Sequence, residues 1–219
     1  MPLPFTRDQF FGVFAAYNES FWPAAVFLWF ASLSAAILLV RGRPAAPRFI
    51  NLLLIVHWMW AALAYHAAFF SRINPAAWLF SGLFLVQAGL LAWQGLASGR
   101  LRFSRGRSLR YRLSWILLGY ALAYPALAFA EGNDFPRLPT FGIPCPTTIL
   151  TIGFLLAADR PLPMVLTFIP ILWAFIGGSA AFLLGVRTDL MLLAAGVSLL
   201  VYMIVTRTTR SNSSQNVPS

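Results

Sequence analysis

The segment FWPAAVFLWFASLSAAILLVRGR, residues 21–43, decides the fold. Its first charged residue is Arg41, and an apolar run of about 20 residues is long enough for one α-helix to cross the hydrocarbon core of a bilayer. The run ends at an arginine rather than at a small-residue cleavage site, and residues 1–19 lack a basic segment followed by an apolar core. We therefore predict a helix that stays in the membrane and no cleavable signal peptide.

Similar apolar runs recur along the whole chain. They cover residues 20–40, 49–70, 76–97, 113–130, 163–185 and 189–206, and a shorter run covers residues 144–158. Hydrophobic residues make up 59% of the chain and charged residues 10%, against about 45–50% and about 25% in soluble domains. The sequence predicts an all-α fold, a polytopic membrane helix bundle of about seven transmembrane helices in which the fifth is short or re-entrant.

Arginine placement predicts how this bundle is oriented. If all seven runs cross the membrane and the N-terminus is outside, most of the arginines fall in cytoplasmic connections, as the positive-inside rule requires. We therefore expect a periplasmic N-terminus and a cytoplasmic C-terminus. The net charge of +10 lies in short clusters between apolar runs and forms no continuous basic face, so nucleic acid is not an expected partner.

The chain divides into a membrane domain and two ends. Residues 20–206 are predicted to form a single transmembrane helical domain in contact with the lipid bilayer. In residues 1–19, Thr6 and Gln9 form a capping box before apolar residues at helical spacing, which predicts an amphipathic interfacial helix on the outer membrane surface. A lid packed on the bundle is the alternative. Residues 207–219 are polar and lack apolar periodicity, which predicts a disordered cytoplasmic tail.

Proline and small residues inside the runs predict the shape of two helices. Pro125 and Pro170 should bend their helices, and bent helices leave room for a cavity. Gly177, Ala181 and Gly185 recur at every fourth position, a pattern that lets a neighbouring helix approach closely.

Polar residues inside apolar runs are rare enough to indicate function. The second run holds His57 and His66, which project from opposite faces of a helix and cannot bind one metal ion together. We expect no carboxylate near the membrane centre, which argues against a proton or sodium pump. The chain has no lysine, which excludes a retinal Schiff base.

Polar groups from several segments converge on the outer ends of the runs, and they predict a ligand-binding site there. The candidate residues are His66, Asn74, Tyr124, Glu131, Cys145 and Thr148. Cys145 is the single cysteine and lies between Pro144 and Pro146 at a helix start, a position that favours thiolate and a soft metal ion such as Cu(I), with His66 as second ligand. The alternative is that Cys145 is a small buried apolar residue in a tightly packed turn.

Three segments, FTRDQFFGVFAAYN, AYHAAFFSRINPAA and FGIPCPTTILTIG, resemble those of a family of small bacterial membrane proteins catalogued as a domain of unknown function. The likeness runs from about Phe5 into the seventh apolar run, and the last two segments are its most specific part. It implies a multi-pass protein of the bacterial inner (plasma) membrane, sometimes loosely labelled a permease. Among the candidate residues, His66, Asn74 and Cys145 match positions of these motifs.

Three functions remain open from the sequence. The first is a small permease or ligand-binding protein whose outer-leaflet site accepts a metal ion or a small polar solute. The second is a non-catalytic subunit that stabilises a larger membrane redox or pigment complex. The third, an enzyme that uses the thiol of Cys145, needs His66 as its base and is not the function that we expect. The sequence identifies no cofactor.

Overall fold

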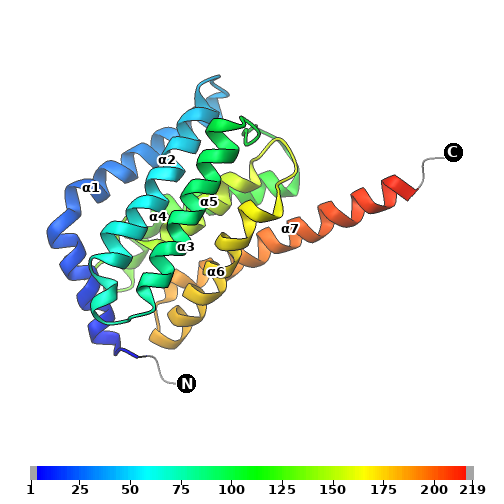
Figure 1. The fold of residues 1–219 in the computed structure, drawn as a ribbon. Helices are drawn as coiled ribbons and strands as arrows, with labels where there is room; N and C mark the ends of the chain where they lie inside the picture. The colour runs from blue at the N-terminus through cyan, green and yellow to red at the C-terminus, as the bar shows by residue number, and fades with distance from the viewer. Residues whose placement is uncertain (1–3, 216–219) are drawn as a thin grey trace.

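The computed structural model describes residues 4–215, and it describes side chains for residues 4–208. The named elements of the described chain are all helices (Figure 1), which confirms the predicted all-α fold. Its elements are α1 (Arg7–Arg41), α2 (Ala46–Trp60), η1 (Ala61–Ala67), η2 (Phe70–Arg72), α3 (Ala77–Leu91), η3 (Ala92–Ala97), α4 (Leu109–Ala130), α5 (Pro144–Leu156), α6 (Met164–Leu184), η4 (Arg187–Asp189) and α7 (Leu190–Gln215).

Within residues 4–215, six helical segments are long and apolar enough to cross a membrane. These are α1, α2 with η1 and η2, α3 with η3, α4, α6, and η4 with α7 up to Thr208. Each presents large apolar side chains outward, such as Phe27 of α1, Phe168 of α6 and Val201 of α7. Such an apolar outer surface suits contact with lipid.

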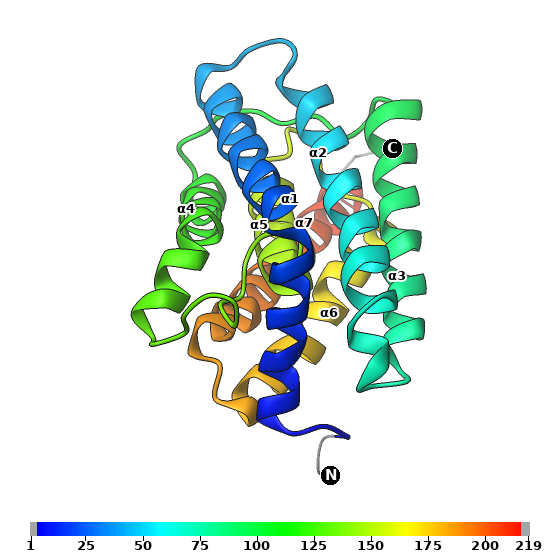
Figure 2. The same ribbon diagram turned by 90° about the vertical axis from the view of Figure 1, so that its left-hand side faces the viewer.

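The short helix α5 is the exception, because it spans 13 residues and all of them are buried. Figure 2 shows α5 in the middle of the bundle, with α4 on one side and α2 on the other. Its C-terminal end pairs with the α3–α4 connection, where Ser104 N donates to Ala157 O (3.0 Å) and Asp159 N donates to Arg102 O (2.9 Å). This connection carries the buried Leu101 into the bundle. The chain therefore enters α5 from one end of the bundle and leaves it toward the other, without returning to the end at which it started.

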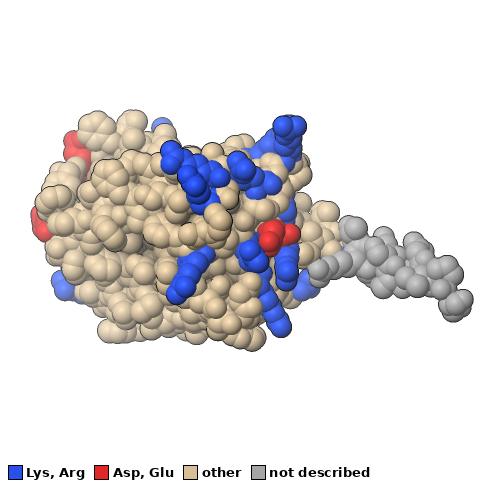
Figure 3. Space-filling model, turned by 90° about the horizontal axis from the view of Figure 1, so that it is seen from above, with Lys and Arg blue, Asp and Glu red and all other residues tan. Residues whose placement is uncertain are grey.

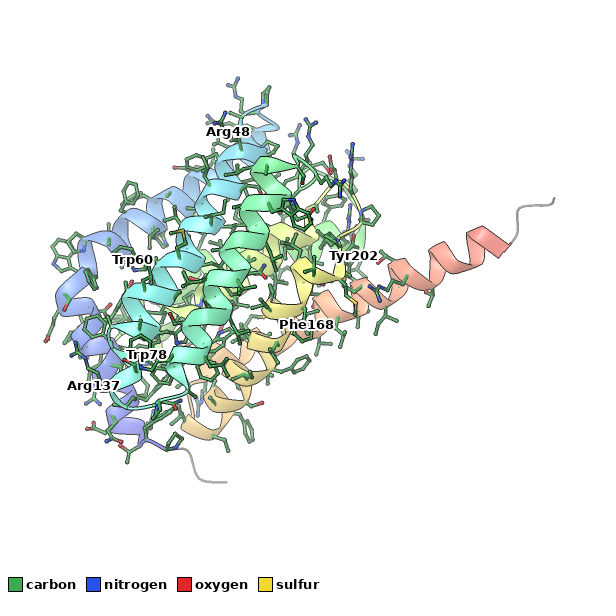
Figure 4. The ribbon with its side chains drawn as sticks, viewed as in Figure 1. Arg48, Trp60, Trp78, Arg137, Phe168 and Tyr202 are labelled. Atoms are coloured by element: carbon green, nitrogen blue, oxygen red, sulfur yellow. The ribbon has the colours of Figure 1, made fainter. Side chains whose placement is uncertain are left out.

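The two ends of the bundle differ in charge. The α1–α2 and α3–α4 connections meet at one end, where arginine side chains gather (Figure 3). Figure 4 shows Arg48 at this end and Arg137 at the opposite one. The Nη1 atom of Arg105 donates to the Val40 carbonyl (2.6 Å), so a cation caps the negative C-terminal end of α1. We call this the arginine-rich end, and we call the opposite end the lid end.

The lid end takes its name from residues 7–20, the N-terminal part of α1. The predicted capping box of Thr6 and Gln9 is present, and α1 bends at Phe21, where the backbone is non-helical two residues before Pro23. Residues 7–20 then turn their apolar face onto the bundle, burying Phe14 among them. The packing is that of the lid rather than of a separate surface helix. Residues 1–3 of the predicted segment lie outside the described residues.

The lid is fixed to the bundle by hydrogen bonds as well as by apolar contacts. The hydroxyl of Tyr17 donates to the Phe141 carbonyl (2.9 Å) and accepts from Trp60 Nε1 (2.8 Å). The Asn18 side chain donates to the carbonyl of Leu138 and accepts from the Thr140 hydroxyl. These bonds join α1 to α2 and to the α4–α5 connection.

At the other terminus, α7 continues to Gln215 and extends past the rest of the bundle (Figure 1). We predicted a disordered tail from residue 207, and this boundary is wrong for residues 207–215. No proline or glycine occurs between residues 207 and 215 to end the helix, and the hydroxyls of Thr206 and Thr208 bond back to carbonyls one turn earlier. Residues 216–219 lie outside the described residues.

Candidate functional site

A cavity of about 240 Å³ lies at the lid end, between the lid, η1, η2, the start of α5, α6 and η4. Seven aromatic side chains line it: Phe5, Phe10, Phe14, Tyr65, Phe70, Phe80 and Trp173. Its polar lining consists of His66, Asn74, Cys145, Ser179 and Asp189. The cavity is thus an apolar space with polar groups placed at a few points, as is typical of small-molecule sites.

His66 is the most unusual group in this wall. It is 0% exposed, and neither of its ring nitrogens has a hydrogen-bond partner among the described residues. The rings of Phe70, Phe80, Phe84 and Trp173 surround it, with centroids 4.8–5.9 Å from the imidazole. An unsatisfied buried polar group costs about 1–3 kcal/mol, so its retention calls for an explanation.

The local backbone explains how His66 comes to face the cavity. It lies in η1, a π-helical segment that interrupts the regular α-helix after Trp60. Such segments are rare and occur often at functional sites, because they rotate the side chains beyond them. The Ser81 hydroxyl donates to the Ala62 carbonyl (3.0 Å), which keeps a backbone group of this segment satisfied.

His57 lies on the same helical segment, in α2, and provides a direct comparison. It too is 0% exposed, but its Nε2 lies 3.1 Å from the Ser32 hydroxyl and its Nδ1 lies 3.3 Å from the Thr147 hydroxyl. Both of its nitrogens are therefore paired inside the protein, between α1 and α5. His57 is a structural residue, and only His66 has unused hydrogen-bonding capacity.

Asp189 is the group that the sequence interpretation missed. A carboxylate directly before an apolar run usually lies in a solvated connection, whereas the structure buries Asp189 to 2% exposure in the cavity wall. Its Oδ1 accepts a hydrogen bond from the Tyr124 hydroxyl, and the Cys145 thiol faces its carboxylate. Within residues 4–208, no arginine or histidine lies at ion-pair distance from it. Asp189 lies at the lid end of the bundle, so it does not bear on the expectation that no carboxylate lies near the membrane centre.

Asp189 is held in place through its neighbour Thr188. The Thr188 hydroxyl donates to Glu131 Oε2 (2.9 Å), its amide donates to the same atom (3.3 Å), and its carbonyl accepts from the Tyr120 hydroxyl (2.7 Å). These bonds attach η4 to α4. Glu131 and Tyr120 thereby position the carboxylate without lining the cavity.

Trp173 is a second residue that the sequence interpretation missed. It lies on α6 in the cavity wall, which it shares with Cys145. Among the described residues, no oxygen or nitrogen accepts a hydrogen bond from it. A tryptophan in an apolar run is more often a packing residue, so nothing in the sequence marks it as polar lining.

The six candidate residues lie in three different relations to the cavity. His66, Asn74 and Cys145 line it, although they come from three separate segments. Tyr124 and Glu131 reach it indirectly, through Asp189 and Thr188. The Thr148 hydroxyl donates to the Pro144 carbonyl of its own helix (2.9 Å) and does not line the cavity.

The lining bears on which ligands suit the site. Within residues 4–208, no group of three or more His, Cys, Asp or Glu side chains is arranged to hold a metal ion. The candidate pair His66 and Cys145 share the cavity wall with seven aromatic rings. This composition favours an organic molecule over a hydrated ion.

A larger hollow of about 630 Å³ lies on the side of the bundle, between α1 and α4. Its lining includes Trp22, Val26, Trp29 and Phe135, and it is almost wholly apolar. The indole N–H of Trp29 is satisfied, because it donates to the Leu122 carbonyl one turn before Pro125 (2.8 Å). This hollow contains no polar group in need of a partner, which distinguishes it from the cavity at the lid end.

A protein-family model described as "Family of unknown function (DUF6064)" matches residues 7–215. No curated protein matches the chain, and no solved structure matches it. The chemistry of the cavity therefore carries the functional argument.

Proposed function

Because the chain belongs to DUF6064, a family of unknown function, we propose its function from the cavity: it is a small permease or ligand-binding membrane protein. The cavity at the lid end holds a small organic molecule that makes hydrogen bonds and has an apolar body. The observation that carries this proposal is the imidazole of His66, buried in the cavity wall with both nitrogens unpaired.

The energetic argument runs from that imidazole to a ligand. A neutral imidazole has one N–H donor and one acceptor nitrogen, and leaving both unpaired in an apolar wall is costly. A leucine or phenylalanine at this position would avoid the cost. A ligand that pairs with the ring supplies the missing hydrogen bonds. Removing the cost of the unpaired imidazole then contributes to the free energy of binding.

The proposed location follows from charge. Arginines gather at the end opposite the cavity (Figure 3), and positive connections remain in the cytoplasm. We place the protein in the bacterial inner membrane, with its N-terminus and the cavity on the periplasmic side. The cavity then accepts its ligand from the periplasm or from the outer leaflet.

The experiment is a screen of purified protein in nanodiscs against a chemically diverse library of small molecules. Binding is read from the rise in the thermal unfolding midpoint, which a ligand of the folded state must produce. We expect compounds that stabilise the wild type and fail to stabilise His66→Phe. Phenylalanine fills the same aromatic surroundings but offers no hydrogen bond.

His57→Gln is the matched control, because it changes a buried histidine that does not line the cavity. It should keep the ligand-induced rise in the unfolding midpoint even if its starting midpoint is lower. If no compound stabilises the wild type, or if the same compounds stabilise His66→Phe equally, the proposed function is wrong.

A further inference from the structure

We propose that the ligand is a small organic cation, a protonated amine carried on an apolar body, and that Asp189 binds its charge. This inference rests on the proposed function and names the class of molecule that the cavity holds. It is carried by the charge of the lining, by the aromatic wall, and by the unpaired nitrogens of His66.

The first step concerns charge. Asp189 is buried, and no arginine or lysine is among the residues that line the cavity. The chain as a whole has a net charge of +10, so the absence of a basic partner here is a property of the site and not of the composition. A buried carboxylate without a cation is strongly disfavoured. A cationic ligand provides the missing counter-charge.

The second step concerns the wall. Phe10, Phe70, Phe80 and Trp173 line the same space, and the faces of aromatic rings attract cations. The ring centroids of Phe80 and Trp173 are 5.2 Å apart in an edge-to-face arrangement, so they form two sides of a corner. Aromatic rings that share a cavity with a carboxylate suit an amine, because they accommodate both its charge and its apolar substituents. They offer nothing comparable to an anion.

The third step concerns hydrogen bonds. An ammonium group donates, and the cavity has acceptors in the carboxylate of Asp189 and in one nitrogen of His66. The other His66 nitrogen and the Trp173 indole N–H are donors, which suits a ligand with an additional acceptor. Tyr124 already donates to Asp189, which holds the carboxylate in the cavity wall.

The test compares three probes of similar shape and different charge: 2-phenylethylammonium, 2-phenylethanol and 3-phenylpropanoate. Each is titrated calorimetrically into the full-length protein in nanodiscs, with empty nanodiscs subtracted. We expect the ammonium probe to bind at least tenfold more tightly than the alcohol, a difference of about 1.4 kcal/mol. The carboxylate probe should bind most weakly.

Asp189→Asn should remove this preference, lowering the affinity for the ammonium probe at least tenfold and leaving the affinity for the alcohol unchanged. Asparagine keeps an oxygen that accepts from Tyr124, so the variant should fold, and its unfolding midpoint checks this. Asp159→Asn, which removes an exposed carboxylate at the arginine-rich end, is the matched control and should keep the preference.

Two results would overturn the inference, and only the second would also overturn the proposed function. If the alcohol or the carboxylate probe binds as tightly as the ammonium probe, or if Asp189→Asn keeps the preference, the cavity binds small molecules but not as cations. If no probe binds and the library screen also yields no His66-dependent ligand, the proposed function fails together with this inference.

Discussion

At the scale of single residues, the two histidines show that burial alone does not identify a functional group. His57 and His66 are equally buried and lie on one helical segment. The difference lies in their neighbours, since two hydroxyls surround His57 and aromatic rings surround His66. His57 therefore stabilises the fold, whereas His66 has hydrogen-bonding groups that no described residue satisfies.

This contrast predicts opposite effects on stability. His57→Leu should lower the free energy of unfolding by about 1–3 kcal/mol, because it leaves buried hydroxyls of Ser32 and Thr147 with one partner fewer. His66→Leu should cost much less or be stabilising, because it removes an unpaired imidazole. Thermal unfolding of both variants without ligand measures the difference. Equal destabilisation would mean that His66 is paired inside the protein.

Asp189 shows where residue-level prediction from the sequence failed. The sequence RTDLMLL places this carboxylate just before an apolar run, which is the usual position of a solvated residue in a connection. Its burial depends on Tyr124 and on the anchoring of Thr188 by Glu131 and Tyr120, more than 50 residues away along the chain. No local pattern reports such contacts, so only the three-dimensional fold reveals them.

At the scale of helices, the packing of α6 against α7 depends on glycine. A Cβ atom on Gly178 would lie 2.5 Å from Leu193 Cγ, and one on Gly177 would lie 2.9 Å from a methyl group of Leu192. The predicted close-packing face is therefore present at Gly177. Gly185 has a different role, because it ends α6 with a positive φ of 70°.

Gly178→Ala should force α6 and α7 apart and lower stability by about 1–3 kcal/mol, as overpacking usually does. Gly89→Ala in α3 is the control, since a Cβ there meets no atom within 4 Å. Alanine has the higher helix propensity, so this control should gain up to about 1 kcal/mol. Unfolding midpoints of the two variants in the same detergent compare them. Similar midpoints would show that the two helices can separate without cost.

Helix boundaries were predictable where the sequence contains a local signal. Thr6 and Gln9 mark the start of α1, and Pro144 marks the start of α5. The sequence does not indicate whether the apolar face of residues 7–20 packs on the bundle or on the membrane surface, because both surfaces can bury apolar side chains. The end of α7 was misjudged because polarity was read as disorder, although a polar sequence without glycine or proline can continue a helix.

At the scale of the whole molecule, the arrangement of arginines predicts the orientation. The arginine-rich end contains the α3–α4 connection, and the lid end contains the α4–α5 connection. In a Cys145→Ala background, Ser108→Cys and Asp134→Cys place a single thiol in each connection. A membrane-impermeant maleimide should label the variant at position 134 in intact cells and the variant at position 108 only after permeabilisation. Labelling in the reverse order would invert the proposed orientation.

The enclosed position of α5 has a consequence for biosynthesis. A segment of 13 residues is too short to partition into lipid by itself, and every one of its side chains is covered by other helices. Helices leave the ribosome in chain order, so α5 emerges before α6 and α7 exist to surround it. We expect chains truncated after residue 160 to leave α5 outside the bilayer and open to added protease, whereas the full-length chain protects it. Protection of α5 in the truncated chain would show that α1 to α4 are enough to bury it.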